Sequence, residues 1–286
     1  MSSSSTESIK NVLKKAGKDA LGGGIPGMAA MIAQVSTLMW LRTTINYQYR
    51  YGVTTTQAFK ALYRDGGISR FYRGYSAAIV QGPLSRFGDT AANTGVLSLL
   101  DQYPTTKEMP IFIKTGFASV AASAFRILLM PIDTVKTMMQ VEGSRGIATL
   151  KDKMQISGPR VLFHGAAAAS VATLVGHYPW FATYNYLNQR IQVPTNPKEK
   201  LLRNAFIGFV SSVVSDTCSN SVRIVKTTRQ TIHEETSYTK IIKMIVDKDG
   251  WGGLFGRGLK TKILTNGLQG MLFSVYWKMG QDYLSK

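Results

Sequence analysis

The chain repeats one pattern three times at intervals of about 90 residues. An aromatic–basic–glycine signature ends at Gly74, Gly165 and Gly258, which are 91 and 93 residues apart. The three copies read Tyr72-Arg73-Gly74, Phe163-His164-Gly165 and, with one additional glycine, Phe255-Gly256-Arg257-Gly258. A fixed period marks tandem structural units, so we expect three similar copies rather than one unique domain.

A second signature lies upstream of the first and has the same period. Its complete copy contains Pro131, Asp133 and Lys136. The matching basic residues Arg42, Lys136 and Lys226 are 94 and 90 residues apart. Two independent signatures therefore predict a mobile tail followed by three repeats, with boundaries at 1–19, 20–104, 105–195 and 196–286.

Each repeat contains two long segments that are poor in charge. The six segments are residues 21–47, 74–100, 110–140, 165–191, 201–230 and 258–283. As helices rising 1.5 Å per residue, they are each long enough to cross a hydrocarbon layer of about 30 Å. A shorter amphipathic stretch, such as 55–63 or 237–246, separates the two segments and suits a helix lying in an interface. The pattern predicts an all-α membrane protein, and the alternative is a soluble helical domain with buried helices.

The charge balance narrows the classes of function. The 286 residues include 34 basic and 16 acidic side chains, a formal net charge of +18, and only 17% of residues are charged. Soluble domains carry about 25% charged residues, so this chain has few charges and most of them suit an anionic partner. One cysteine and three histidines provide no metal cluster, and no nucleophile lies beside a spaced base. We therefore expect neither an enzyme nor a metal or other cofactor, and the scattered basic residues do not predict nucleic-acid binding.

These repeats and signatures resemble the mitochondrial carrier family over about residues 20–284. The resemblance implies six transmembrane helices in a pseudo-three-fold barrel of three helix hairpins, each with a short interfacial helix. It further implies a multi-pass protein of the mitochondrial inner membrane whose central cavity opens alternately to the two sides.

In this family the odd-numbered helices kink at a proline, and an acid and a base follow two and five residues later. The acid of one repeat pairs with the base of the next and closes the matrix side. Only the second repeat is complete here, so the resemblance implies one true pair, Asp133 with Lys226, and a like-charge encounter of Arg223 with Arg42. The implied matrix gate comprises Pro131, Asp133, Lys136, Arg42, Arg223 and Lys226.

The second gate of the family, on the cytoplasmic side, survives here only as uncharged residues. Its remnant is Tyr184, Asn185 and Asn188. The two asparagines can still hydrogen-bond to each other, although such a bond contributes only about 1 kcal/mol.

The cavity between the two gates is expected to contain Arg126 and Asp216. Each lies ten residues before the lysine of its repeat, so the two occupy equivalent positions in adjacent odd helices. Charges within a membrane mark function by default, but a mutual Arg126–Asp216 bridge that only ties two helices explains them equally well. Further polar candidates for the cavity are Gln81, Arg86, His177, Thr265, Asn266 and Gln269.

The aromatic–basic–glycine signatures have a separate implied role. Backbone N–H groups at a helix start favour a phosphate, and the family holds cardiolipin at these positions. The implied sites for cardiolipin and other anionic lipids comprise Tyr72, Arg73, Gly74, Gly165, Arg257 and Gly258.

Two functions remain open at this point. The first is a solute carrier that exchanges a small anionic or zwitterionic metabolite by alternating access. The second is a carrier-fold protein with lost or reduced transport, acting as a subunit of a larger inner-membrane (respiratory) complex. The polar cavity favours the first function, and the incomplete gates favour the second.

Overall fold

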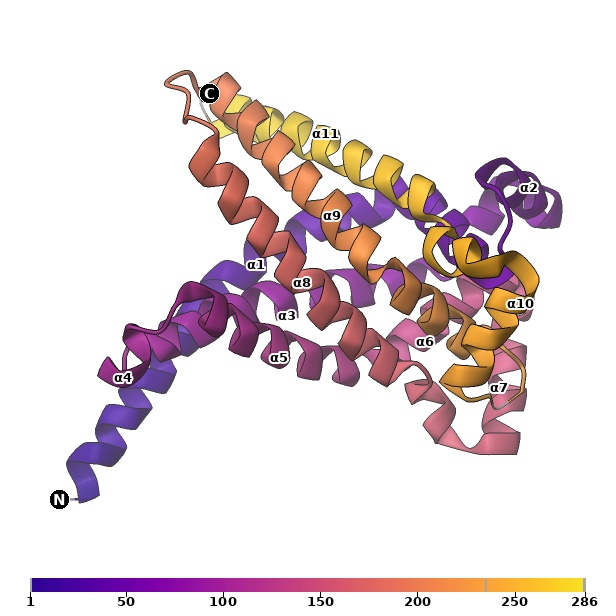
Figure 1. Ribbon diagram of the computed structural model, residues 1–286, viewed down its shortest axis with the longest axis horizontal. Helices are drawn as coiled ribbons and strands as arrows, with labels where there is room; N and C mark the ends of the chain where they lie inside the picture. Colours follow the sequence, from indigo (N-terminus) through magenta and orange to yellow (C-terminus); the bar gives the residue numbers. More distant parts are fainter. Residues whose placement is uncertain (1, 235, 285–286) are drawn as a thin grey trace.

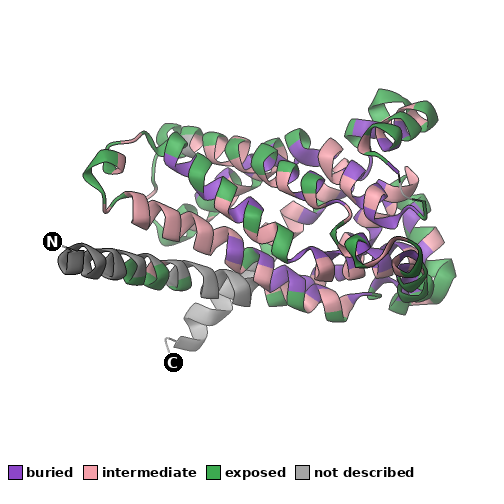
Figure 2. Ribbon diagram, turned by 90° about the horizontal axis from the view of Figure 1, so that it is seen from below, coloured by how far each residue is buried: buried purple, intermediate pink, exposed green. Residues whose placement is uncertain are grey.

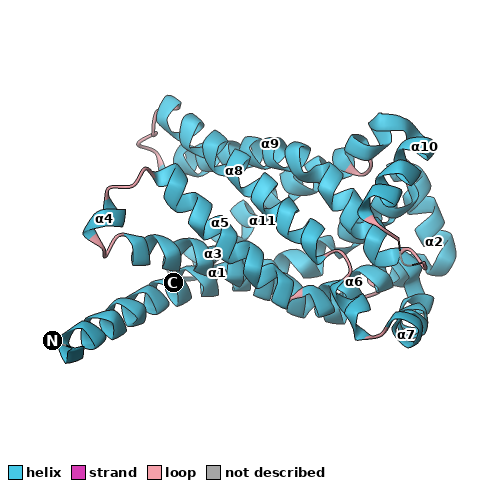
Figure 3. Ribbon diagram, turned by 60° about the horizontal axis from the view of Figure 1, so that its bottom comes forward, coloured by secondary structure: helices cyan, strands magenta, loops and turns pink. Residues whose placement is uncertain are grey.

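The computed structural model describes residues 2–234 and 236–284, and within these the side chains of 2–13, 16, 20, 22–30, 185 and 272–284 lie outside the description. All regular secondary structure in the described part of the chain is helical (Figure 3). This agrees with the predicted all-α class.

Long helical units follow one another along the described chain (Figure 1). They are α1 (Ser2–Tyr51), α3 (Tyr75–Leu100), α5 with α6 (Ile111–Leu128 and Met130–Glu142), α8 (Ala166–Arg190), α9 (Pro197–Thr231) and α11 (Leu259–Leu284). Neighbours contact each other in the order α1, α3, α5, α8, α9 and α11, and α11 in turn contacts α1. The helix contacts therefore close into a ring.

The connections between the long helices contain shorter helices. They are α2 (Thr55–Phe71), α4 (Pro104–Lys107), α7 (Gly146–Ser157), α10 (Tyr238–Gly256) and the 3₁₀ turns η1 (Gly143–Arg145) and η2 (Pro159–Phe163). Helices α2, α7 and α10 gather at one end of the molecule, whereas α4 and the α8–α9 connection lie at the other (Figures 1 and 3). One short helix of this kind per repeat was expected from the amphipathic stretches.

The first 19 residues were expected to form a mobile tail, and their mobility stays a prediction. The helix α1 begins at Ser2 and runs through this stretch without interruption. The carboxylate of Asp19 accepts a hydrogen bond from Ser98 of α3 at 2.7 Å, which ties this part of α1 to the ring.

The first long helices of repeats 1 and 2 bend at equivalent positions, and the one in repeat 1 bends without a proline. The break between α5 and α6 falls at Leu129, and Pro131 occupies the first turn of α6. In α1 the backbone is non-helical at Leu38, beside Thr37, the residue that stands where the other repeat has proline. The Thr37 hydroxyl donates to the carbonyl of Ala33 at 2.8 Å, and hydroxyl bonds of this type bend helices.

Glycine allows the second long helix of a repeat to start directly against the first long helix of the next repeat. Gly74 precedes α3 with φ +83°, and a Cβ there would lie 3.0 Å from the carbonyl oxygen of Lys136 in α6. Gly165 precedes α8 with φ +91°, and a Cβ there would lie 3.3 Å from the carbonyl oxygen of Lys226 in α9. The signature glycines therefore bring each hairpin against the next repeat.

The apolar core is concentrated where a short helix meets two long ones. Ile241 and Ile245 of α10 are buried with Ile45 and Tyr49 of α1 and Ile224 of α9. Figure 2 shows buried residues concentrated in the half of the molecule that carries the short helices. The amphipathic face predicted for 237–246 thus packs into the protein at two of its apolar positions, Ile241 and Ile245.

Two stretches of the described chain are long and apolar enough to cross a membrane, Ile111–Leu128 and Pro159–Arg190. Ionisable side chains such as Arg42 in α1 and Asp216 in α9 interrupt the apolar stretches of other long helices. Six membrane-spanning helices were expected from the sequence, and two stretches pass this test of length and composition. The architecture with six spanning helices therefore stays a prediction.

A buried arginine of α2 binds the end of α6. Arg70 is 3% exposed and donates to the carbonyl groups of Gln140 at 2.9 Å and Val141 at 2.7 Å. Its guanidinium also pairs with Asp65 at 2.5 Å. A cation at this place satisfies carbonyl groups that lack helical partners and interacts favourably with the helix dipole.

The same arrangement recurs at the ends of α9 and α1. Lys153 of α7 is buried and donates to the carbonyl of Gln230 at 2.8 Å, and its burial lowers the pKa of the ammonium to about 8. Arg257 follows α10, pairs with Asp249 at 2.6 Å and donates to the carbonyl of Tyr49 at 3.3 Å. Buried cations therefore fasten three long helices at one end of the ring.

We expect Arg70→Met to lower the free energy of unfolding by about 3 kcal/mol, because it leaves two buried carbonyl groups without a donor. For a chain of this size the corresponding fall in the thermal midpoint is roughly 6–12 °C. Thermal unfolding of the detergent-purified protein measures it. The control is Arg64→Met, which removes an exposed cation from the same helix. Equal midpoints for the two variants would contradict the capping role.

Candidate functional site

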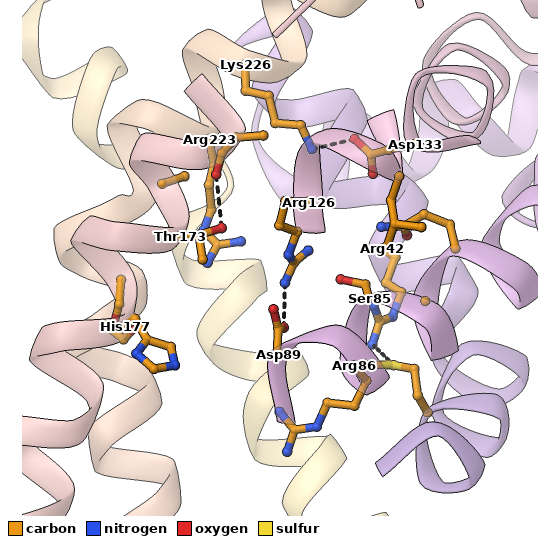
Figure 4. Close-up of a pocket in the computed structure, with 18 of the residues that line it drawn as sticks. Arg42, Ser85, Arg86, Asp89, Arg126, Asp133, Thr173, His177, Arg223 and Lys226 are labelled. Carbon is orange, nitrogen blue, oxygen red and sulfur yellow. Dashed lines mark hydrogen bonds and ion pairs between the residues drawn. The ribbon is translucent and has the colours of Figure 1, made fainter. Parts of the chain in front are cut away.

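The long helices enclose a cavity of about 770 Å³ (Figure 4). Polar and charged side chains from every member of the ring line it. Its charged residues are Arg42, Arg86, Asp89, Arg126, Asp133, Lys136, Arg223, Lys226 and Lys262.

A single carboxylate joins α6 to α9 in the cavity wall. Asp133 is 6% exposed and accepts from Lys226 at 2.5 Å, from Lys136 at 2.6 Å and from the Gln230 amide at 3.1 Å. The Asp133–Lys226 pair is the one implied by the sequence. The contact with Lys136 arises within one helix, since Met39 stands where the first repeat would otherwise offer Lys136 an acid.

Uncharged bonds complete the connections at this end. The Asn46 amide of α1 donates to Gln140 of α6 at 2.5 Å, and the Tyr49 hydroxyl of α1 donates to Asn220 of α9 at 2.8 Å. Asn46, Gln140 and Gln230 have the 94- and 90-residue spacing of the second signature. Their role in joining repeats was not predicted, although the spacing contained the signal.

Arg42 and Arg223, which were expected to meet with like charge, have separate contacts. The Arg223 guanidinium lies 3.8 Å from Asp216 and donates to Ser219 at 3.1 Å. The Arg42 Nη2 lies 3.6 Å from the sulfur of Met31, and its Nε is buried without a hydrogen-bond partner in the described part of the chain. No carboxylate in the described part of the chain therefore pairs with Arg42.

Arg126 pairs with an acid that the sequence analysis did not single out. Its Nη2 lies 2.7 Å from Asp89 of α3, and both side chains are partly exposed to the cavity (Figure 4). The signal available in the sequence was a lone acid within a segment poor in charge. This pair replaces the mutual Arg126–Asp216 bridge that we considered, and that bridge is absent from the described residues.

Asp216 lies behind the cavity wall. It is 6% exposed, accepts from the Asn266 amide of α11 and faces Arg223 of its own helix. Thr265 is 1% exposed and donates to the carbonyl of Thr261. Asp216, Thr265 and Asn266 were expected in the cavity, but they are not among the residues that line it. The reason is that α9 and α11 pack directly on each other at this level.

Four other expected cavity residues do line it: Gln81, Arg86, His177 and Gln269. Gln81 accepts a hydrogen bond from Lys136 at 2.9 Å. His177 is bonded to the Ser119 hydroxyl through Nδ1 at 2.7 Å and packs on the ring of Phe181. This is the environment of a packed, hydrogen-bonded histidine.

The residues that remain of the second gate, Tyr184, Asn185 and Asn188, do not form one cluster of contacts in the described part of the chain. Tyr184 lines the cavity and stacks on Trp180 with ring centroids 5.1 Å apart. Asn188 accepts from Arg203 of α9 at 2.9 Å, so it holds the start of the next repeat. The side chain of Asn185 lies outside the described residues, and its bond to Asn188 stays a prediction.

The residues implied in lipid binding differ in exposure and in their contacts. Tyr72 and Arg73 are exposed. No side chain caps α3 or α8, so backbone N–H groups at these helix starts remain available. Arg257, in contrast, is 7% exposed and uses its donors on Asp249 and Tyr49. Its guanidinium serves the helix-end contacts described above, whereas lipid binding at the three glycines, Gly74, Gly165 and Gly258, stays a prediction.

We expect Asp133→Asn to destabilise the protein by about 3–5 kcal/mol, because two lysines would lose their buried carboxylate. Asp89→Asn is the matched control, since Asp89 is 24% exposed and has a single ion-pair partner. The measurement is the thermal midpoint in detergent. Adding Lys226→Met to Asp133→Asn should restore part of the loss by removing one unpaired charge. Similar midpoints for the two single variants would argue against a central role for Asp133.

Known proteins with similar sequences are carriers. The sequence model described as "Mitochondrial carrier protein" matches residues 107–194 and 197–286. An uncharacterised mitochondrial carrier of Schizosaccharomyces pombe is 24% identical over 92% of this chain and 91% of its own length. Mitochondrial ornithine transporter 1 of Saccharomyces cerevisiae is 22% identical over 87% and 90%. A calcium-dependent mitochondrial ATP-magnesium/phosphate carrier of Arabidopsis thaliana is 23% identical over 85% of this chain and 52% of its own. The family model covers more than half of the sequence, so the chain belongs to the mitochondrial carrier family.

Proposed function

We propose that this protein exchanges a small anionic or zwitterionic metabolite across the mitochondrial inner membrane by alternating access. The observation that carries the proposal is the cavity of about 770 Å³, which is lined by ionised groups and enclosed by a closed ring of helices. Removing charges from bulk water costs free energy, so ionised groups gathered inside a helix ring mark a solute site.

The outer surface of the ring supports a membrane location. Phe117, Val120 and Leu128 of α5 are 52%, 59% and 72% exposed. Large apolar side chains exposed along one helix suit contact with lipid tails rather than water. Six spanning helices are then possible even where composition is polar, because the polar groups of α1 and α9 face the cavity or neighbouring helices.

We assign the opening and closing of the cavity to the contacts at the end of the ring where the short helices lie. Asp133 holds Lys226 of the next repeat, and Asn46 holds Gln140. The lysine side chains are 17% and 21% exposed, so water screens their ion pairs and lowers the free energy needed to separate them. We assign this end to the matrix side, as the resemblance implies.

The relatives leave the solute open. Their printed names include ornithine as well as ATP-magnesium and phosphate, which differ in charge. The alternative role as a structural subunit finds no support in the comparisons, because the relatives are named as carriers or transporters.

The proposal predicts that the purified protein in cardiolipin-containing liposomes exchanges a labelled anionic or zwitterionic metabolite. Arg126→Ala should reduce the exchange rate at least about tenfold, since it removes a cavity cation and leaves Asp89 unpaired. The control is Arg64→Ala, whose side chain is exposed on α2 outside the cavity. Thermal midpoints confirm that both variants are folded. Failure of a broad panel of such metabolites to exchange would refute the proposal.

A further inference from the structure

The charges that line the cavity do not balance. Seven of the lining residues are lysine or arginine and two are aspartate. Asp216, behind the wall, adds one more negative charge nearby. The site therefore retains four or more positive charges in excess.

The three carboxylates are already engaged. Asp133 is shared by two lysines, Asp89 accepts from Arg126, and Asp216 is bonded to Asn266 and faces Arg223. No carboxylate in the described part of the chain pairs with Arg42, Arg86 or Lys262, all of which line the cavity.

Donors also remain unused. The Nε atoms of Arg42 and Arg126 are buried without partners in the described residues. The nearest acceptor of the Arg42 guanidinium is a thioether sulfur at 3.6 Å, which is a weak acceptor. Lys262 interacts electrostatically most strongly with Asp216, and it also lies within reach of Arg223, Arg42 and Arg126. These cations come from α1, α5, α9 and α11, and all four line the same cavity.

Like charges at this density repel one another, because the surrounding protein screens them less than bulk water does, and the repulsion is relieved by a bound anion. A single negative charge would offset only a small part of the excess. A zwitterion would add an ammonium group to a site that already repels cations.

We propose that the transported solute is an organic anion with at least two negative charges, a polycarboxylate or an organic phosphate, held among Arg42, Arg223 and Lys262. This inference rests on the proposed function and narrows its solute class. Guanidinium groups match both carboxylate and phosphate geometry, so the two sources share one recognition chemistry.

The test measures thermal midpoints of the detergent-purified full chain with five probes at matched ionic strength. Malate, citrate and glucose 6-phosphate carry two or more negative charges, whereas glutamine is zwitterionic and ornithine is cationic. We expect a rise in midpoint with at least one of the three anions and none with glutamine or ornithine. The anion that stabilises best distinguishes a carboxylate from a phosphate ligand.

Titration of that anion against variants locates the site. Arg42→Gln should raise its apparent Kd at least about tenfold, as expected for loss of one charge-assisted contact. Lys262→Gln is the second variant, in case Arg42→Gln does not fold, and Arg64→Gln is the control outside the cavity. An unchanged Kd in both cavity variants would overturn the proposal. So would a rise in thermal midpoint with glutamine or ornithine that equals or exceeds the rise with the anions. The proposal would also be overturned if none of the three anions raised the midpoint.

Measuring both anion binding and exchange in liposomes distinguishes a failure of this inference from a failure of the proposed function. Anion binding without exchange in liposomes would refute transport and leave the polyanion site standing. Exchange of glutamine without any effect of the anions would leave transport standing and refute the polyanion site.

Discussion

The free-energy cost of burying ionised side chains among helices governs where the polar residues of this chain lie. The two carboxylates that line the cavity are both paired, and Asp133 is shared by two lysines. Other buried cations, such as Arg70 and Lys153, bind carbonyl groups at helix ends. The cations that remain face the cavity, where water or a solute can compensate them. The same constraint thus stabilises the ring and leaves an excess of basic side chains around its cavity.

The two ends of the ring differ in how they are held. At the end with the short helices, the carboxylates of Asp133 and Glu142 and a few amide bonds join α1, α6 and α9. At the other end, Arg203 ties the start of α9 to Asn188, and Lys114 of α5 pairs with Asp101 at 2.5 Å. These latter bonds join consecutive helices rather than closing the cavity. The contacts of Asp133 and Asn46, in contrast, join helices of different repeats.

The sequence predicts the helices better than the contacts between them. The segments 74–100 and 165–191 agree closely with α3 and α8, because glycine marks their starts and low charge their extent. The family resemblance implied the pair of Asp133 with Lys226, and the structure contains it. The sequence did not identify Asp89 as the partner of Arg126, nor the position of Asp216 behind the wall. Those depend on helix rotation and side-chain reach, which periodicity does not determine.

The central claim is that a hydrated, positively charged cavity lies inside a ring that contacts lipid outside. Thiol labelling in liposomes tests it directly, after the exposed Cys218 has been replaced by serine. Thr173 lines the cavity and Phe117 lies exposed on α5, so each is replaced in turn by cysteine. The account predicts that an anionic methanethiosulfonate reagent labels Thr173→Cys faster than a cationic one, and that neither labels Phe117→Cys appreciably. Labelling of Phe117→Cys without Thr173→Cys, or faster reaction of the cationic reagent at Thr173→Cys, would contradict it.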